Sequence, residues 1–293
     1  MTQTIAFIGL GVMGYPMAGH LNAQSNLNVR VYNRTPEKAQ HWAEEHAGKA
    51  CKTSAEAVSG ADAVVTCVGA DRDLEAIYQG QDGILAHARN GAVLIDHTTA
   101  SAGAARTLAQ AADERGLLFV DAPVSGGQKG AESGQLTIMC GGTEDAFARA
   151  EPLMGVYGKA VNRMGDVGAG QLTKCVNQIT VAGLLQGLSE GLHFAEQAGL
   201  DTQKVVDVIS QGAAQSWQMD NRAETMISGQ YDHGFAVDWM RKDLNICLQE
   251  AREHRAALPV TALVDQFYQD VQALGGGRWD TSSLLERLRE NSG

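Results

Sequence analysis

Residues 4–14 read TIAFIGLGVMG, a short β-branched and apolar run that ends in a G-x-G-x-x-G turn, and an amphipathic segment follows as far as Leu21. In such a turn the first glycine allows the tight bend, the second lets backbone approach a pyrophosphate, and the third lets the helix pack on the strand. The helix N-terminus adds unpaired N–H groups and partial positive charge. This context predicts a dinucleotide site formed by Gly9, Gly11, Val12, Met13 and Gly14.

The first half of the chain alternates short apolar runs with helix-length segments, which is typical of a parallel sheet buried on both faces. The expected strands are Thr4–Ile8, Val29–Tyr32, Ala63–Val68, Ala92–Ile95, Leu117–Asp121 and Leu136–Cys140. The predicted fold class is therefore α/β, with an N-terminal Rossmann domain built on a doubly wound, mostly parallel sheet.

The pattern changes near Arg163. A proline-free segment with helical apolar spacing runs from Gly168 to Gly199. As one helix it would be roughly 45 Å long at about 1.5 Å per residue, enough to be the spine of a second domain. No convincing strand follows it, and Trp217 and Trp239 fit a core role better than a pocket wall. We expect a NADP-binding Rossmann domain over 1–165 and an all-helical substrate and oligomerisation domain over 166–293, joined by this long helix.

Composition excludes several classes of function. The 293 residues include 23 Lys plus Arg against 34 Asp plus Glu, a formal charge of −11, which predicts no binding to nucleic acid or anionic lipid. No uninterrupted apolar run reaches the length of a membrane span, and the N-terminus lacks the features of a signal peptide. The five cysteines form no C-x-x-C pair and the histidines no HExxH motif, which predicts a cytoplasmic protein without a metal site.

The residues after the second expected strand bear on the nucleotide. An NAD enzyme usually carries an acid there for the ribose hydroxyls, but this chain has Asn33-Arg34-Thr35. A guanidinium and a hydroxyl suit an adenosine 2′-phosphate, and Lys38 could add a second cation. The sequence favours NADP over NAD as cofactor. Thr35 could at the same time simply cap the next helix, with Pro36 at its first position.

Two further stretches carry groups suited to carbonyl chemistry. Ser125-Gly126-Gly127 follows the fifth expected strand, and its hydroxyl and unshielded amides could hold a carboxylate. On the long helix, Lys174, Asn177 and Gln178 share one face, and a buried lysine there could donate or accept a proton. Each stretch also has an ordinary structural interpretation, a glycine-rich turn for the first and a solvated charge near a helix start for the lysine.

The motifs GLGVMG, NRT, DAPVSGGQKGAESGQL, GAGQLTKCVNQ and WMRKDL, in this order across nearly the whole chain, resemble the β-hydroxyacid dehydrogenase family. This family includes 3-hydroxyisobutyrate dehydrogenase and tartronate, glyoxylate and succinic semialdehyde reductases. The resemblance implies a Rossmann domain plus a helical domain, and reversible hydride transfer between NAD(P) and the alcohol carbon of a short 3-hydroxy acid.

The resemblance also implies roles for individual residues. It implies that Lys174 is the catalytic acid and base, with Asn177 and Gln178 beside the substrate. It also implies that Ser125 to Gly127 bind the carboxylate of the substrate. The remaining implied residues are Phe235 and Asp243 near the substrate, and Lys242, Val68, Gly69 and Thr99 along the cofactor. Val68-Gly69 departs from the Leu-Pro common in the family, and His97 stands where the family usually has a small or apolar residue.

Several alternatives remain open at this level. An imine reductase shares the fold but commonly replaces the lysine, and a 6-phosphogluconate enzyme has a much longer helical domain. A non-catalytic NADP-binding or scaffold protein is the rival from another class. The expected partner is a small carboxylate-bearing aldehyde or hydroxy acid, and a helix this long predicts a homodimer or homotetramer that covers its apolar surface.

Overall fold

The computed structural model describes residues 2–290. The chain divides into two compact units between Lys174 and Cys175, within the long helix α9 (Ala169–Gln197). The sequence analysis places the boundary earlier, where this helix begins, and the domain limits 1–165 and 166–293 stay a prediction.

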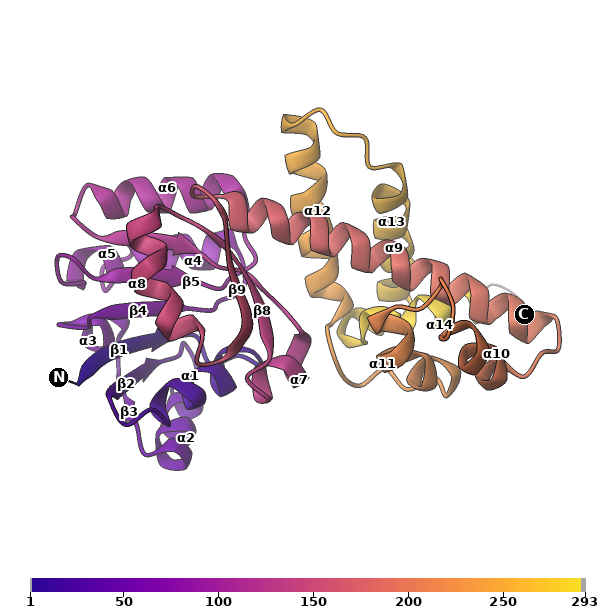
Figure 1. Cartoon of the computed structure of the whole chain (residues 1–293), viewed down its shortest axis with the longest axis horizontal. Helices are drawn as coiled ribbons and strands as arrows, with labels where there is room; N and C mark the ends of the chain where they lie inside the picture. The colour runs from indigo at the N-terminus through magenta and orange to yellow at the C-terminus, as the bar shows by residue number, and fades with distance from the viewer. Residues whose placement is uncertain (1, 291–293) are drawn as a thin grey trace. The chain divides into compact units, whose positions relative to one another are not determined.

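Unit 1 is a nine-stranded sheet with helices on both faces (Figure 1). The strands are β1 (Gln3–Ile8), β2 (Leu27–Tyr32), β3 (Lys49–Ala50), β4 (Ala63–Thr66), β5 (Val93–Asp96), β6 (Leu118–Asp121), β7 (Val124–Ser125), β8 (Leu136–Gly141) and β9 (Gly158–Gly165). The helices are α1 (Gly14–Asn22), α2 (Pro36–His46), α3 (Ser54–Val58), α4 (Asp71–Gln79), α5 (Ile84–His87), α6 (Ala102–Asp113), α7 (Gly127–Glu132) and α8 (Glu144–Met154).

The sheet order is β3-β2-β1-β4-β5-β6-β8-β7, with β9 paired to β8. The pairs from β3 to β6 are all parallel, and β8 runs antiparallel to β6 and β7. The chain reverses its direction of winding between β1 and β4, so the carboxyl ends of these strands form the crevice in which doubly wound folds bind ligands. All six predicted strands are present, and the predicted α/β fold is confirmed.

Each central strand feeds two hydrophobic cores because successive side chains point to opposite faces. Ile5 and Phe7 pack with α1, α2, α7 and α8, whereas Ala6 and Ile8 pack with helices α3 to α6. Each Å² of apolar area that is removed from water stabilises the fold by about 25 cal/mol, and the sheet buries such area on both faces. Because the sheet is the rigid part of unit 1, it fixes the loops that leave its carboxyl edge.

Unit 2 holds the rest of α9 together with shorter helices, and its described part has no strand. These helices are α10 (Thr202–Ile209), α11 (Trp217–Ile227), α12 (Val237–Glu253), α13 (Pro259–Ala273) and α14 (Leu284–Glu290). Leu185 packs with α12 and α13, and Leu192 packs with α10 and α11. The expected core role of Trp217 and Trp239 is wrong, because these two residues are 48% and 41% exposed.

Candidate active site

The glycine turn has the geometry that the sequence predicts. A Cβ on Gly9, whose φ is +98°, would lie 2.2 Å from the Cys67 carbonyl oxygen, and one on Gly14 would lie 2.0 Å from the Gly9 carbonyl oxygen. A Cβ on Gly11 would meet nothing within 4 Å. Gly9 and Gly14 are therefore required by the fold itself, whereas Gly11 leaves open space at the start of α1. No side chain caps this helix, so the turn fits the pyrophosphate of a dinucleotide.

Asn33 holds the glycine turn against the end of β2. Its Oδ1 accepts from the Leu10 amide at 2.9 Å, and its Nδ2 donates to the Thr35 carbonyl oxygen at 3.0 Å. Thr35 stands at the N-cap of α2 with proline in the first turn, but its side chain makes no capping hydrogen bond. The Thr35 hydroxyl is therefore not used by the helix.

Arg34 has a partner that the sequence analysis missed. Its Nη1 lies 3.1 Å from Oδ1 of Asp73, in the first turn of α4. No local pattern could have shown this contact, because it joins the loop after β2 to the start of α4, which follows β4. An acid therefore does reach this side of the glycine turn, although not from the end of β2.

The loops after β4 and β5 are locked together by a buried carboxyl. Asp96 Oδ1 accepts from the Thr66 hydroxyl at 2.8 Å and from the Thr98 amide at 3.1 Å, and the Thr98 hydroxyl accepts from the Val68 amide at 3.0 Å. Asp96 is fully buried, and burial raises its pKa to about 6. This network fixes the backbone of Val68 and of the segment that leads to Thr99.

The start of α9 is fastened to the same edge of the sheet. Asp121, at the end of β6, accepts from the Gly168 amide at 2.8 Å through Oδ1 and from the Gln171 amide at 2.9 Å through Oδ2. It therefore caps the helix from a distant strand. Burial raises the pKa of this carboxyl to about 7, while the two amide hydrogen bonds act in the opposite direction.

The Gln171 side chain completes this attachment. Its Nε2 donates to the Thr98 carbonyl oxygen at 2.7 Å, and its Oε1 accepts from the Ala100 amide at 3.0 Å. A Cβ on Gly170 would lie 2.5 Å from the Met139 carbonyl oxygen, so only glycine permits this approach of the helix to the sheet. We call the Asp121 and Gln171 contacts the helix clamp.

Lys174 lies one turn beyond Gln171 on α9, and only 7% of its surface is exposed. The clamp therefore fixes the backbone that carries this lysine relative to the carboxyl edge of the sheet. Ser125 ends β7, and Gly126 and Gly127 follow with φ values of +131° and +63°, which L side chains rarely adopt. A Cβ on Gly127 would meet nothing within 4 Å, so its backbone is open to a ligand.

His97 serves the structure of the sheet edge. Its Nδ1 lies 2.6 Å from the Ala122 carbonyl oxygen and must donate to it, and burial lowers the pKa of the ring to about 4. The ring is therefore neutral, and its Nε2 accepts from the Tyr157 hydroxyl at 2.7 Å. The unusual residue at this position is a hydrogen-bonded core histidine that joins β5 and β6.

In unit 2, four of the expected residues form one hydrogen-bonded group. The Asn177 amide donates to Gln178 Oε1 at 2.8 Å, and the Gln178 amide donates to Asp243 Oδ2 at 2.7 Å. Lys242 lies 3.0 Å from the other oxygen of Asp243, which is 2% exposed. Phe235 packs against the core of α9, α12 and α13.

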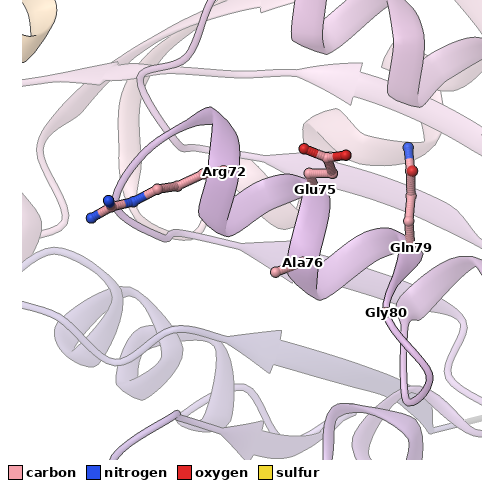
Figure 2. Close-up of a pocket in the computed structure, with 5 residues that line it drawn as sticks. All are labelled: Arg72, Glu75, Ala76, Gln79 and Gly80. Atoms are coloured by element: carbon pink, nitrogen blue, oxygen red, sulfur yellow. The ribbon is translucent and has the colours of Figure 1, made fainter.

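Two open pockets lie on the surface of unit 1. One of about 400 Å³ is on the outer side of α4, lined by Arg72, Glu75, Ala76, Gln79 and Gly80 (Figure 2). A groove of about 590 Å³ runs along α1 between Val12 and Ala23. Within residues 2–290 no group of His, Cys, Asp and Glu side chains is arranged to hold a metal ion, and none of the five cysteines forms a disulfide.

Comparison with known proteins places both halves of the chain. Residues 4–165 match the NAD binding domain of 6-phosphogluconate dehydrogenase, and residues 168–288 match the family described as NAD-binding of NADP-dependent 3-hydroxyisobutyrate dehydrogenase. The chain belongs to the β-hydroxyacid dehydrogenase family. The family assignment made from the motifs is confirmed, and with it the activity class: the chain is an NAD(P)-dependent hydroxyacid dehydrogenase.

Relatives of this family match the chain over nearly its full length. An uncharacterized oxidoreductase of Shewanella frigidimarina is 58% identical over 287 residues, covering 98% of each chain. The 2-(hydroxymethyl)glutarate dehydrogenase of Eubacterium barkeri is 34% identical over 291 residues, covering 99% of this chain and 96% of that protein.

Two solved structures share the complete fold of this hydroxyacid dehydrogenase. Mycobacterium tuberculosis 3-hydroxyisobutyrate dehydrogenase with L-serine has a TM-score of 0.89 at 30% identity, covering 99% of this chain and 100% of that one. Psf3 in complex with NADP+ and 2-OPP has a TM-score of 0.88 at 26% identity, covering 97% of this chain and 99% of that one.

Among the described helices, none is long and apolar enough to cross a bilayer.

Proposed function

We propose that this hydroxyacid dehydrogenase transfers a hydride reversibly between NADP(H) and a short 3-hydroxy acid or its semialdehyde, with Lys174 as general acid and base. Candidate substrates are 3-hydroxyisobutyrate, tartronate semialdehyde and succinic semialdehyde. The observation that carries the proposal is the buried Lys174 on the clamped start of α9, in the same unit as the glycine turn and the Ser125 loop.

Charge explains the choice of a lysine. When bound, the nicotinamide supplies or accepts the hydride. During reduction, negative charge develops on the carbonyl oxygen, and the Lys174 ammonium stabilises that charge more than the uncharged ground state and donates its proton. During oxidation, the neutral amine accepts the hydroxyl proton. Because Lys174 is only 7% exposed, water screens this interaction weakly.

The Ser125 loop is suited to hold the substrate carboxylate. The Ser125 hydroxyl and the amides of Gly126 and Gly127 offer hydrogen-bond donors. No side chain shields the two amides because both residues are glycines, and both adopt positive φ. Binding the carboxylate at a fixed place leaves the carbonyl of a 3-carbon semialdehyde a defined distance further on. This is the basis for proposing a short acid as substrate.

The hydrogen-bonded group in unit 2 offers further polar side chains for the substrate and the cofactor. We assign Asn177 and Gln178 to orient the reacting oxygen, and Asp243 with Phe235 to the substrate side. Lys242 is assigned to the cofactor side. The hydrogen bonds from Asn177 to Gln178 and from Gln178 to Asp243 fix the direction in which each amide presents its oxygen and nitrogen.

The cofactor preference follows from the residues after β2. Arg34 is exposed even though it pairs with Asp73, and the Thr35 hydroxyl does not cap α2, so both side chains can meet an adenosine 2′-phosphate. The solved relative Psf3 carries NADP+. NAD is the less favoured cofactor.

We further propose a cytoplasmic homodimer or homotetramer. Val176, Leu184 and Phe194 on α9 are 63%, 42% and 71% exposed, an apolar surface that a second copy of the chain would cover. Cysteines that form no disulfide in the described residues fit a reducing compartment. Light scattering should give a mass of at least two chains, and a mass near 31.1 kDa would contradict an oligomer.

A steady-state panel tests the proposed reaction. We expect measurable oxidation of a short 3-hydroxy acid with NADP, faster than with NAD and faster than for the 2-hydroxy isomer or for the ester that lacks a free carboxylate. Lys174→Ala should lower kcat at least about 10²-fold with nucleotide binding retained. Equal rates for acid and ester would overturn the carboxylate assignment.

A further inference from the structure

The contact between Arg34 and Asp73 spans the crevice above β1. Arg34 follows β2 and Asp73 lies at the start of α4, which follows β4, and β1 lies between these two strands in the sheet. The glycine turn leaves the same end of β1. The ion pair therefore closes across the side of the crevice where the adenosine half of a dinucleotide lies next to the end of β2.

Exposure makes this pair easy to exchange. The Arg34 side chain is 88% exposed and that of Asp73 is 21% exposed, with 3.1 Å between Nη1 and Oδ1. Exposed ion pairs contribute little to stability, whereas a phosphate offers a guanidinium two charge-assisted hydrogen bonds. An incoming 2′-phosphate can therefore replace the carboxylate as the partner of Arg34.

Asp73 nevertheless stays in place after this exchange. It lies in the first turn of α4, where the helix dipole attracts a negative charge. Asp71 in the same turn is engaged elsewhere, because it accepts from the Ser101 amide at 3.0 Å and from the Ser101 hydroxyl at 2.6 Å. A cofactor with the phosphate would thus meet a fixed negative charge beside Arg34, whereas one without it leaves the ion pair intact.

We propose that Asp73 is a selectivity residue that limits the preference of this enzyme for NADP over NAD. It does so by competing with the 2′-phosphate for the Arg34 guanidinium and by repelling that phosphate. The inference rests on the proposed binding of the phosphate at Arg34. It adds a residue outside the β2 loop to the determinants of cofactor choice.

Affinities for both cofactors test the inference. In the intact enzyme, Asp73→Asn should raise the ratio of the NADH Kd to the NADPH Kd about two- to fivefold, the size of one exchanged surface charge pair. The effect should be smaller in an Arg34→Ala background, where only the repulsion between Asp73 and the phosphate remains, and it should shrink as salt is added.

Glu75→Gln is the matched control. It removes the same charge from the same helix, and no ion pair of Glu75 is found within residues 2–290. Its exposed side chain lines the pocket that Figure 2 draws. This variant should leave the ratio unchanged.

The outcomes separate the two proposals. If Arg34→Ala leaves NADPH affinity unchanged, the phosphate does not bind there and the proposed cofactor preference fails. If Arg34→Ala weakens NADPH binding but Asp73→Asn leaves the ratio unchanged, or shifts it no more than Glu75→Gln, the role of Asp73 alone is overturned.

Discussion

Replacing Gln171 with methionine removes half of the helix clamp while leaving the volume of the side chain nearly unchanged. Gln171 is 1% exposed and holds the Thr98 carbonyl oxygen at 2.7 Å and the Ala100 amide at 3.0 Å. In Gln171→Met both backbone groups stay buried without these partners. Each such loss costs about 1–3 kcal/mol, so the free energy of unfolding should fall by about 2–6 kcal/mol.

Two measurements follow this loss. Urea unfolding monitored by circular dichroism gives the free energy, and hydrogen exchange gives the protection of the Ala100 amide, which should exchange at least about tenfold faster, equivalent to about 1.4 kcal/mol. Gln186→Met is the control on the same helix. Gln186 is 6% exposed, but its one described bond goes to the exposed Glu190 side chain, so we expect a loss of at most about 1 kcal/mol.

The clamp also bears on catalysis, because it fixes the backbone one turn before Lys174. Gln171→Met should therefore lower kcat more than it raises KM, whereas Gln186→Met should change neither. Unchanged stability and unchanged Ala100 exchange in Gln171→Met would refute the clamp. A stability loss with unchanged kcat would refute only its role in placing the lysine.

The other predictions concern the glycine turn and the buried carboxyl of Asp96. Gly14→Ala should unfold or strongly destabilise unit 1, because its Cβ would lie 2.0 Å from a carbonyl oxygen. Gly11→Ala should keep the Tm of the protein, because its Cβ meets no atom within 4 Å. Its nucleotide affinity, measured by titration calorimetry, should fall about tenfold or more. Burial raises the folded-state pKa of Asp96 from 3.8 to about 6, so its contribution to stability is present below 3.8 and is lost as the pH rises through 6. The difference in unfolding free energy between wild type and Asp96→Asn should fall across that pH range; a constant difference would argue against a raised pKa.

The fold was readable from the sequence where local and tertiary preferences agree. The six predicted strands are buried runs that parallel pairing requires to be apolar, and the turn at Gly9 to Gly14 marks its own position. The strand β9 (Gly158–Gly165) was not predicted, because it pairs with β8 at the edge of the sheet and alternates between half-buried and exposed residues. Short β3 and β7 carry too few residues to show any period.

The candidate site was readable only in part. Glycines and the Lys174 stretch carry their chemistry in their spacing, so the sequence could place them. Asp121 and Gln171 act through contacts with residues far away in the chain, such as Gly168, which comes 47 residues after Asp121. One signal was available: Asp121 ends a buried strand, where an acid needs a partner. The contact between Arg34 and Asp73 gave no such signal, since Asp73 reads as an ordinary surface charge.

Chemical rescue of Lys174→Ala tests the central claim most directly. With saturating cofactor and a good hydroxy-acid substrate, we predict a single-turnover rate for hydride transfer that is at least about 10²-fold below wild type and that rises with the concentration of an added primary alkylamine, while nucleotide affinity stays the same. A wild-type rate in the variant would contradict the account, because the proton would then be carried by another group.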